Sequence, residues 1–97
     1  MPTFVLERYL PGVSHAEAEA VLRREAEAAA AMAAAGRAVH VLHATLVEGD
    51  ESVTSVVEAP SRADVVELGE RAGAPADRVV PAVALKPSTP RPDEVAG

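Results

Sequence analysis

The order in which strand-like and helix-like segments follow one another constrains this chain more than any single motif does. Four runs rich in β-branched and aliphatic residues are separated by two helix-forming stretches and one tight turn. The sequence therefore predicts the order strand–helix–strand–strand–helix–strand. We expect strands at residues 3–10, 38–48, 52–58 and 78–85, and helices between Ser14 and Ala35 and between Ser61 and Gly73.

Local signals support these boundaries. Ser14 stands three residues before Glu17, which is the spacing of a capping box, and Ser61 stands three residues before Asp64. Each serine is therefore predicted to be the N-cap of a helix. Pro81, in the last strand, has no N–H to donate to a ladder, so that strand is expected at an edge of the sheet.

This order of elements is that of the split β-α-β, or ferredoxin-like, α+β fold. It predicts one four-stranded antiparallel sheet in the order 4-1-3-2, with both helices on one face. The other face, called the open face below, must then meet solvent, a ligand or a second subunit. We expect residues 1–86 to form a single domain of this kind and the Pro-rich residues 87–97 to be a flexible tail.

Composition excludes several classes of function. The chain has 97 residues and no cysteine, so it forms no disulfide, thiolate nucleophile or iron–sulfur cluster. Fifteen acidic against nine basic residues argue against a nucleic-acid partner, because phosphate binding needs clustered Lys and Arg. The start does not resemble a signal peptide, and no apolar run is long enough to span a bilayer. A cytoplasmic protein without a membrane partner is therefore expected.

Alternation along each strand assigns side chains to the two faces of the sheet. His40 and His43 are three positions apart, so we expect them on opposite faces, and "HVLH" is then no pair of metal ligands on one strand. The helix-covered face is expected to hold Phe4, Leu6, Leu42, Ala44, Leu46, Val53 and Val57. The open face is expected to hold Val5, Glu7, Tyr9, Val41, His43, Thr45, Thr54, Val56 and Glu58.

Three residues of the open face form the candidate site. Glu7, His43 and Glu58 come from three adjacent strands, and two carboxylates with one imidazole suit nickel, zinc, manganese or iron in mixed N/O coordination. Alternatively, His43 is a general base oriented by a carboxylate. In a plainer interpretation His43 is an interface residue and the two glutamates only pair with neighbouring arginines. His15 and His40 are expected to be solvated.

Several stretches resemble a family of small, mostly uncharacterised bacterial domains, one branch of which is described as nickel-binding with a ferredoxin-like fold. The stretches are "ERYLPG" at 7–12, "VLHATLV" at 41–47, "VVEAP" at 56–60 and "RAGAPADRVV" at 71–80. Where that family has an aromatic residue, one further residue and then His-Ser, this chain keeps only His43. Where the third strand of the family commonly reads Cys-x-Tyr-Glu-Ala-Pro, this chain has Ser55 and Val57 but keeps Glu58. The resemblance implies the same fold, a dimer, and a metal such as nickel near His43.

Three functions remain as alternatives. The first is a homodimeric, non-enzymatic binding protein that pairs its open faces or edges and holds a divalent transition metal near His43; the apolar Val5, Val41 and Val56 favour such association. The second is an enzyme of the dimeric ferredoxin-like barrel type, acting on a small organic substrate with His43 as acid/base. The low aromatic content argues against it. The third is a structural or regulatory dimer without a ligand.

Overall fold

The computed structural model describes residues 1–85 and 87–88 of the chain. Its elements are β1 (Thr3–Tyr9), α1 (His15–Ala34), β2 (His40–Val47), the 3-10 turn η1 (Glu48–Asp50), β3 (Ser52–Glu58), α2 (Arg62–Arg71) and β4 (Arg78–Ala82). The predicted tail, residues 87–97, lies outside the described residues except for Pro87 and Ser88.

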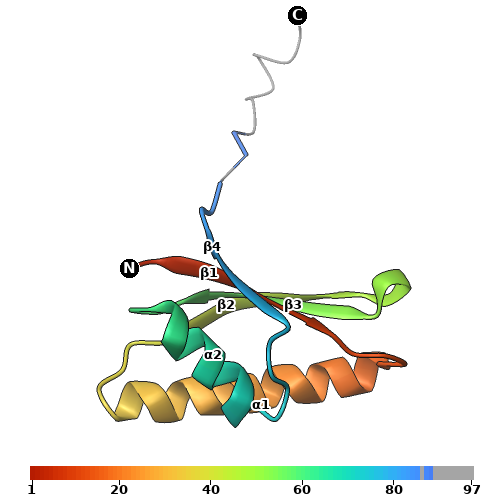
Figure 1. Cartoon of the computed structure of the whole chain (residues 1–97), viewed down its shortest axis with the longest axis horizontal. Coiled ribbons are helices and arrows are strands. Elements are labelled where there is room, and N and C mark those ends of the chain that lie inside the picture. Colours follow the sequence, from red (N-terminus) through yellow and green to blue (C-terminus); the bar gives the residue numbers. More distant parts are fainter. Residues whose placement is uncertain (86, 89–97) are drawn as a thin grey trace, which may run out of the picture.

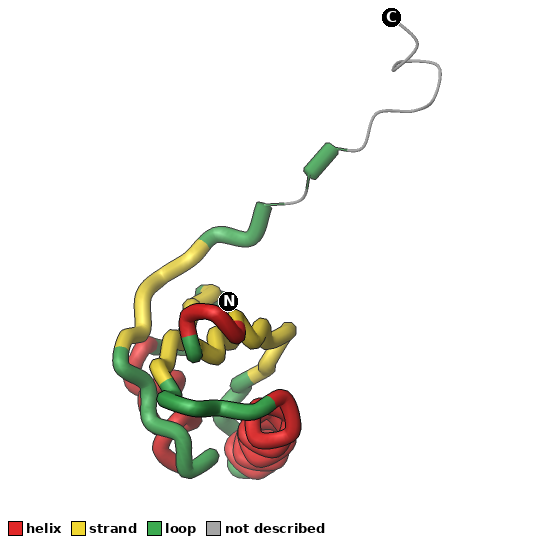
Figure 2. The backbone as a smooth tube through the Cα atoms, turned by 90° about the vertical axis from the view of Figure 1, so that its right-hand side faces the viewer, coloured by secondary structure: helices red, strands yellow, loops and turns green. Residues whose placement is uncertain are grey.

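The four strands form one antiparallel sheet in the order β2-β3-β1-β4, which is the predicted order read from the other edge. Figure 1 shows both helices below the sheet, and Figure 2 shows the same two layers from the side. The predicted ferredoxin-like α+β arrangement is thus confirmed, and Pro81 lies in an edge strand as expected. Neither helix in the described part of the chain is long and apolar enough to cross a membrane.

Both helices begin at the predicted serines. The Oγ of Ser14 accepts a hydrogen bond from the backbone N–H of Glu17 at 3.1 Å, and the Oγ of Ser61 accepts one from Asp64 at 3.3 Å. These bonds satisfy N–H groups that have no partner within the helix, which is why serine is favoured there. The residues that α1 buries recur at three- and four-residue steps and are Ala18, Val21, Glu25, Ala29 and Met32.

The core fills the space between the helices and the covered face of the sheet. Phe4 and Leu6 from β1 and Val57 from β3 are buried there, as predicted, against Met32 of α1 and Leu68 of α2. β4 is three residues shorter than predicted because its last residue, Ala82, pairs with Thr3, where β1 begins. Only Met1 and Pro2 precede Thr3, and Pro2 has no N–H to donate, while its carbonyl accepts from the backbone N–H of Ala59.

β2 departs from simple alternation at one residue. Its pairing with β3 shifts between Val41 and His43, so Leu42 is an extra residue, a β-bulge. Val41 consequently lies opposite the buried Val57 and packs against the core, although alternation had placed it on the open face. Leu42 was expected on the covered face, yet 47% of its surface is exposed.

The bulge also corrects the prediction for the two histidines. His40 lies opposite Glu58, and His43 lies opposite Val56. Glu58 and Val56 are two positions apart on a regular strand and therefore share a face. His40 and His43 thus both lie on the open face. The prediction that they face opposite ways is wrong, because the inserted Leu42 changes the parity on which it relied.

Candidate functional site

The register of the strands arranges the open face as rows of side chains that run across the sheet, because residues opposite each other in antiparallel strands point the same way. In strand order, the first row is His40, Glu58, Thr3 and Ala82. The second is His43, Val56, Val5 and Val80, and the third is Thr45, Thr54, Glu7 and Arg78. The side chains of a type that can bind metals on these rows, His40, His43 and Glu58, therefore lie at the β2 side of the first two rows.

His43 and Glu58 are neighbours on this face. His43 is exposed at the end of the second row, and Glu58 stands on the adjacent strand in the first row. Such diagonal positions have Cα atoms about 7–8 Å apart, within reach of two long side chains. His40 lies directly opposite Glu58 and is also exposed. The ligand-type residues that the fold brings nearest to one another here are thus His40, His43 and Glu58.

Glu7 shares the open face but not this neighbourhood. It lies opposite Thr54, four positions from Glu58 along β3, which is about 13 Å at the rise of a strand. Its Oε2 lies 3.5 Å from the Nε of Arg78. Of the three predicted site residues, the register therefore brings together His43 and Glu58 and leaves Glu7 beside an arginine.

One copy of the chain does not assemble a full coordination shell. Within residues 1–85 and 87–88, no three His, Asp or Glu side chains stand close enough together to hold a metal ion. Protein sites for transition metals commonly use three or four side-chain ligands. The donor types on the open face fit such an ion, but their number in a single copy does not complete its shell.

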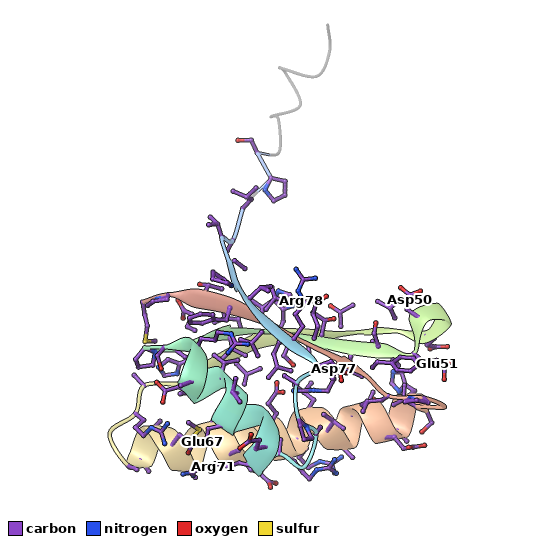
Figure 3. All side chains as sticks on the ribbon, viewed as in Figure 1. Asp50, Glu51, Glu67, Arg71, Asp77 and Arg78 are labelled. Atoms are coloured by element: carbon purple, nitrogen blue, oxygen red, sulfur yellow. The ribbon has the colours of Figure 1, made fainter. Side chains whose placement is uncertain are left out.

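A shallow hollow of about 330 Å³ occupies the other end of the open face, where Glu7, Tyr9, Thr54, Asp77 and Arg78 contribute to its lining. Asp77 and Arg78 are labelled at the start of β4 in Figure 3. The Oδ2 of Asp77 accepts a hydrogen bond from the backbone N–H of Tyr9 at 2.6 Å. Glu7 and Arg78 pair with each other at this hollow, and Asp50 adds a further carboxylate to its lining.

The charged pair that sequence reasoning missed lies under the helices. Arg8 follows Leu6 by two positions and therefore faces the core; its Nη2 donates a hydrogen bond to the Oε2 of Glu25 at 2.5 Å, and both side chains are fully buried. Alternation along β1 carried this signal, since Arg8 belongs to the set of Phe4 and Leu6. Among the described residues, the Nε and Nη1 of Arg8, the Oε1 of Glu25 and the Oγ of Ser55 have no hydrogen-bond partner. Ordered water satisfies such atoms in many proteins.

A second charged network lies on the helix side, away from the open face. The Nη1 of Arg37 donates a hydrogen bond to the Oε2 of Glu67 at 2.7 Å, and the Nε of Arg71 forms an ion pair with the same oxygen, also at 2.7 Å. Arg37 also pairs with Asp64. Figure 3 labels Glu67 and Arg71 on α2. The hydrogen bonds from Arg37 lower the pKa of Asp64 and the pKa of Glu67 below their ordinary values. This network ties the connection between α1 and β2 to α2.

Comparisons with known proteins match nearly the whole described fold. A family model described as "Nickel responsive protein SCO4226-like" matches residues 4–82. The crystal structure of SCO4226 from Streptomyces coelicolor A3(2) is similar in fold, with a TM-score of 0.59 and 25% sequence identity, over 84% of this chain and 99% of that chain. No curated protein matches the chain.

Proposed function

The chain belongs to the SCO4226-like family of nickel responsive proteins, and on that basis we propose that it is a small, non-enzymatic protein that binds a divalent transition metal, nickel first among them, on the open face of its sheet. We propose His43 as the central ligand, with Glu58 beside it. A cytoplasmic location stays a prediction of the sequence.

One observation supports this proposal above the others. The strand register places His40, His43 and Glu58 at neighbouring positions on the uncovered face. Imidazole nitrogen and carboxylate oxygen together are a donor set that suits nickel and similar ions. Both imidazoles are exposed, so an ion reaches them without any rearrangement of the core.

The number of ligands supports a homodimer. Because one copy does not gather three ligand side chains within its described residues, a second His43 and Glu58 from a symmetric partner would raise the count to four. Glu7 stays a predicted ligand. Because it lies about 13 Å along the strand direction from Glu58 and on the neighbouring strand, it would reach the same ion only from the second copy.

Calorimetric titration of the metal-free protein with nickel chloride tests this function. We expect His43→Ala to weaken nickel binding by about tenfold or more and Glu58→Gln to weaken it to a smaller extent, because ligands and their close partners contribute on this scale. His15→Ala is the matched control, since His15 is an exposed imidazole on α1, beside Glu19. Glu7→Gln decides whether Glu7 takes part.

Two results would count against the proposal. If folded His43→Ala bound nickel as the wild type does, His43 would not be the ligand. If the wild type bound no divalent metal by titration or elemental analysis, the ligand-free dimer would be favoured instead. Turnover of a small organic substrate that His43→Ala abolishes without any metal would favour the barrel-type enzyme.

A further inference from the structure

We propose that a hollow on the helix side of the molecule binds a short aliphatic peptide, the size of a dipeptide, by its two charged ends. The hollow, called the helix-side hollow below, has a volume of about 370 Å³, and its lining includes Leu10, Pro11, Val13, Glu17, Ala20 and Arg24. The proposal goes beyond metal binding, because none of the lining residues belongs to the rows of the open face.

Three segments far apart in the sequence form the helix-side hollow, namely the loop between β1 and α1, the first half of α1, and the turn after α2. In the loop, the backbone N–H of Val13 donates to the carbonyl of Leu10 at 3.0 Å. The Nε of Arg24 donates to the carbonyl of Ala72 at 2.7 Å and holds the end of α2 beside α1 (Figure 1). The walls of the hollow are therefore formed before any ligand arrives, as in most ligand pockets.

Arg24 supplies a positive charge at one end of the hollow. Its hydrogen bond to the carbonyl of Ala72 uses only Nε, and no ion pair in the described part of the chain involves its guanidinium. The side chain is exposed, so a ligand reaches it from solvent. Because Nε is held, Nη1 and Nη2 remain as a planar fork, which matches the two oxygens of a carboxylate.

Glu17 supplies a negative charge at the other end. Its backbone N–H is bonded to the N-cap Ser14, but among the described residues its carboxylate forms no ion pair. Glu17 and Arg24 are seven residues apart, close to two turns of helix. They therefore leave α1 on the same side, about 10.5 Å apart along its axis, with Ala20 between them.

This spacing selects the length of the ligand. Each charge-assisted contact takes up about 3 Å, so a ligand that bridges the two groups needs its own charges about 5 Å apart. The ammonium and the carboxylate of a free amino acid are separated by only about 2.5 Å, whereas the ends of an extended dipeptide are about 6 Å apart. A dipeptide with a free amino end and a free carboxyl end therefore fits, and a single amino acid does not.

The lining and the overall charge favour an aliphatic zwitterion. Between the two charged groups the walls are apolar, with Leu10, Pro11 and Val13 on one side and Ala20 and Val21 on the other. Small aliphatic side chains gain free energy by leaving water for such a surface. The protein has a formal net charge of −6, which repels a simple anion, but a zwitterion has no net charge to be repelled.

A titration of the full chain with L-alanyl-L-valine in EDTA, followed by the backbone amide signals in NMR spectra, tests the helix-side hollow. We expect the signals of Val13, Ala20 and Gly73 to shift with a dissociation constant of about 1 mM or lower, the scale for a ligand of this size. The N-acetylated dipeptide, the dipeptide amide and free L-valine should each bind about tenfold more weakly or worse, because each loses one charged contact.

Variants of the hollow give the second half of the test. Glu17→Gln and Arg24→Gln should each raise the dissociation constant by about tenfold or more. Glu27→Gln and Arg23→Gln are the matched controls, because they remove the same charges from exposed positions of α1 outside the hollow. Ala20→Leu should also abolish binding, since it fills the middle of the hollow and leaves both charges in place.

Four results would overturn the inference. They are the absence of any shift at 10 mM dipeptide, shifts confined to residues outside the hollow, equal binding of the capped peptides or of L-valine, and unchanged binding by folded Glu17→Gln and Arg24→Gln. The dispersion of the amide signals verifies the fold of each variant. Because EDTA removes divalent metal, a failure here leaves the proposed metal site untouched, and a failure to bind nickel leaves the helix-side hollow untouched.

Discussion

At the scale of single residues, the least expected feature is the ion pair of Arg8 and Glu25 inside a core of mostly small side chains. Taking both charges out of water is costly, and in other proteins such pairs stabilise little compared with apolar residues of similar volume. Removing one partner of the pair strongly destabilises a protein, because the other charge then stays buried without a counter-charge.

Glu25→Met should therefore lower the free energy of unfolding by about 3–5 kcal/mol. The double variant Arg8→Met with Glu25→Met should recover most of that loss, since no buried charge remains. Urea unfolding of the wild type, both single variants and the double variant gives the coupling energy. A loss below about 1 kcal/mol in Glu25→Met would show that Arg8 finds other partners, such as water.

The network around Arg37 predicts a dependence on pH. The pKa values of Asp64 and Glu67 are lower in the folded protein than in the unfolded chain, because Arg37 donates hydrogen bonds to both carboxylates. Such groups add stability at pH values above their ordinary pKa of about 4, and this stability is lost as the pH falls through their lowered values.

Arg37→Gln should thus have a lower urea midpoint than the wild type at pH 7, and the difference should shrink toward zero as the pH falls well below 4. Arg23→Gln removes the same charge from the exposed face of α1 and leaves the network intact. It is the control for the change in net charge. A difference that stays constant from pH 7 to pH 2 would mean that the network does not stabilise the fold.

At the scale of elements, the β-bulge at Leu42 decides what the open face contains. Alternation predicts faces correctly along β1 and β3, which pair without interruption from Thr3 to Tyr9 and from Ser52 to Glu58. Along β2 it holds from His43 onward and fails at His40, Val41 and Leu42. A bulge depends on how two strands far apart in sequence pair, so the period of one strand does not reveal it.

Deleting Leu42 tests this interpretation. Val41 and His43 already lie opposite the consecutive residues Val57 and Val56, so the deletion should leave a regular ladder and a folded protein. Deleting Ala44, in contrast, shifts the part of β2 on one side of the deletion by one residue and turns its core-facing side chains outward. Thermal melts followed by circular dichroism should show a cooperative transition for the first deletion and a severely lowered one for the second.

At the scale of the whole molecule, assembly and stability should be linked. If two copies associate as the proposed homodimer, the folded dimer is favoured by mass action, and the unfolding midpoint should rise with protein concentration. Calorimetry of the metal-free protein over a hundredfold range of concentration measures this rise. We expect this rise in His43→Ala as in the wild type, because no metal is present; a midpoint independent of concentration in the wild type would contradict the homodimer.

The sequence alone was sufficient for the elements, their order and the strand order of the sheet. The elements depend on local chemistry, namely serine caps, runs of β-branched residues, and glycine or proline where an element ends. The strand order then follows because this succession of elements is that of the split β-α-β fold. It also sufficed to place Glu7, His43 and Glu58 on the uncovered face, since each lies in a part of its strand that pairs regularly with its neighbour.

Only the tertiary structure decided which of these side chains are neighbours. The bulge moved His40 to the open face beside Glu58, and the register set Glu7 four positions away beside Arg78. Arg8 forms its ion pair with Glu25 of α1, 17 residues away in the sequence. Each outcome depends on how segments distant in sequence pack and pair, and neither the period of one strand nor the composition of one helix contains that information.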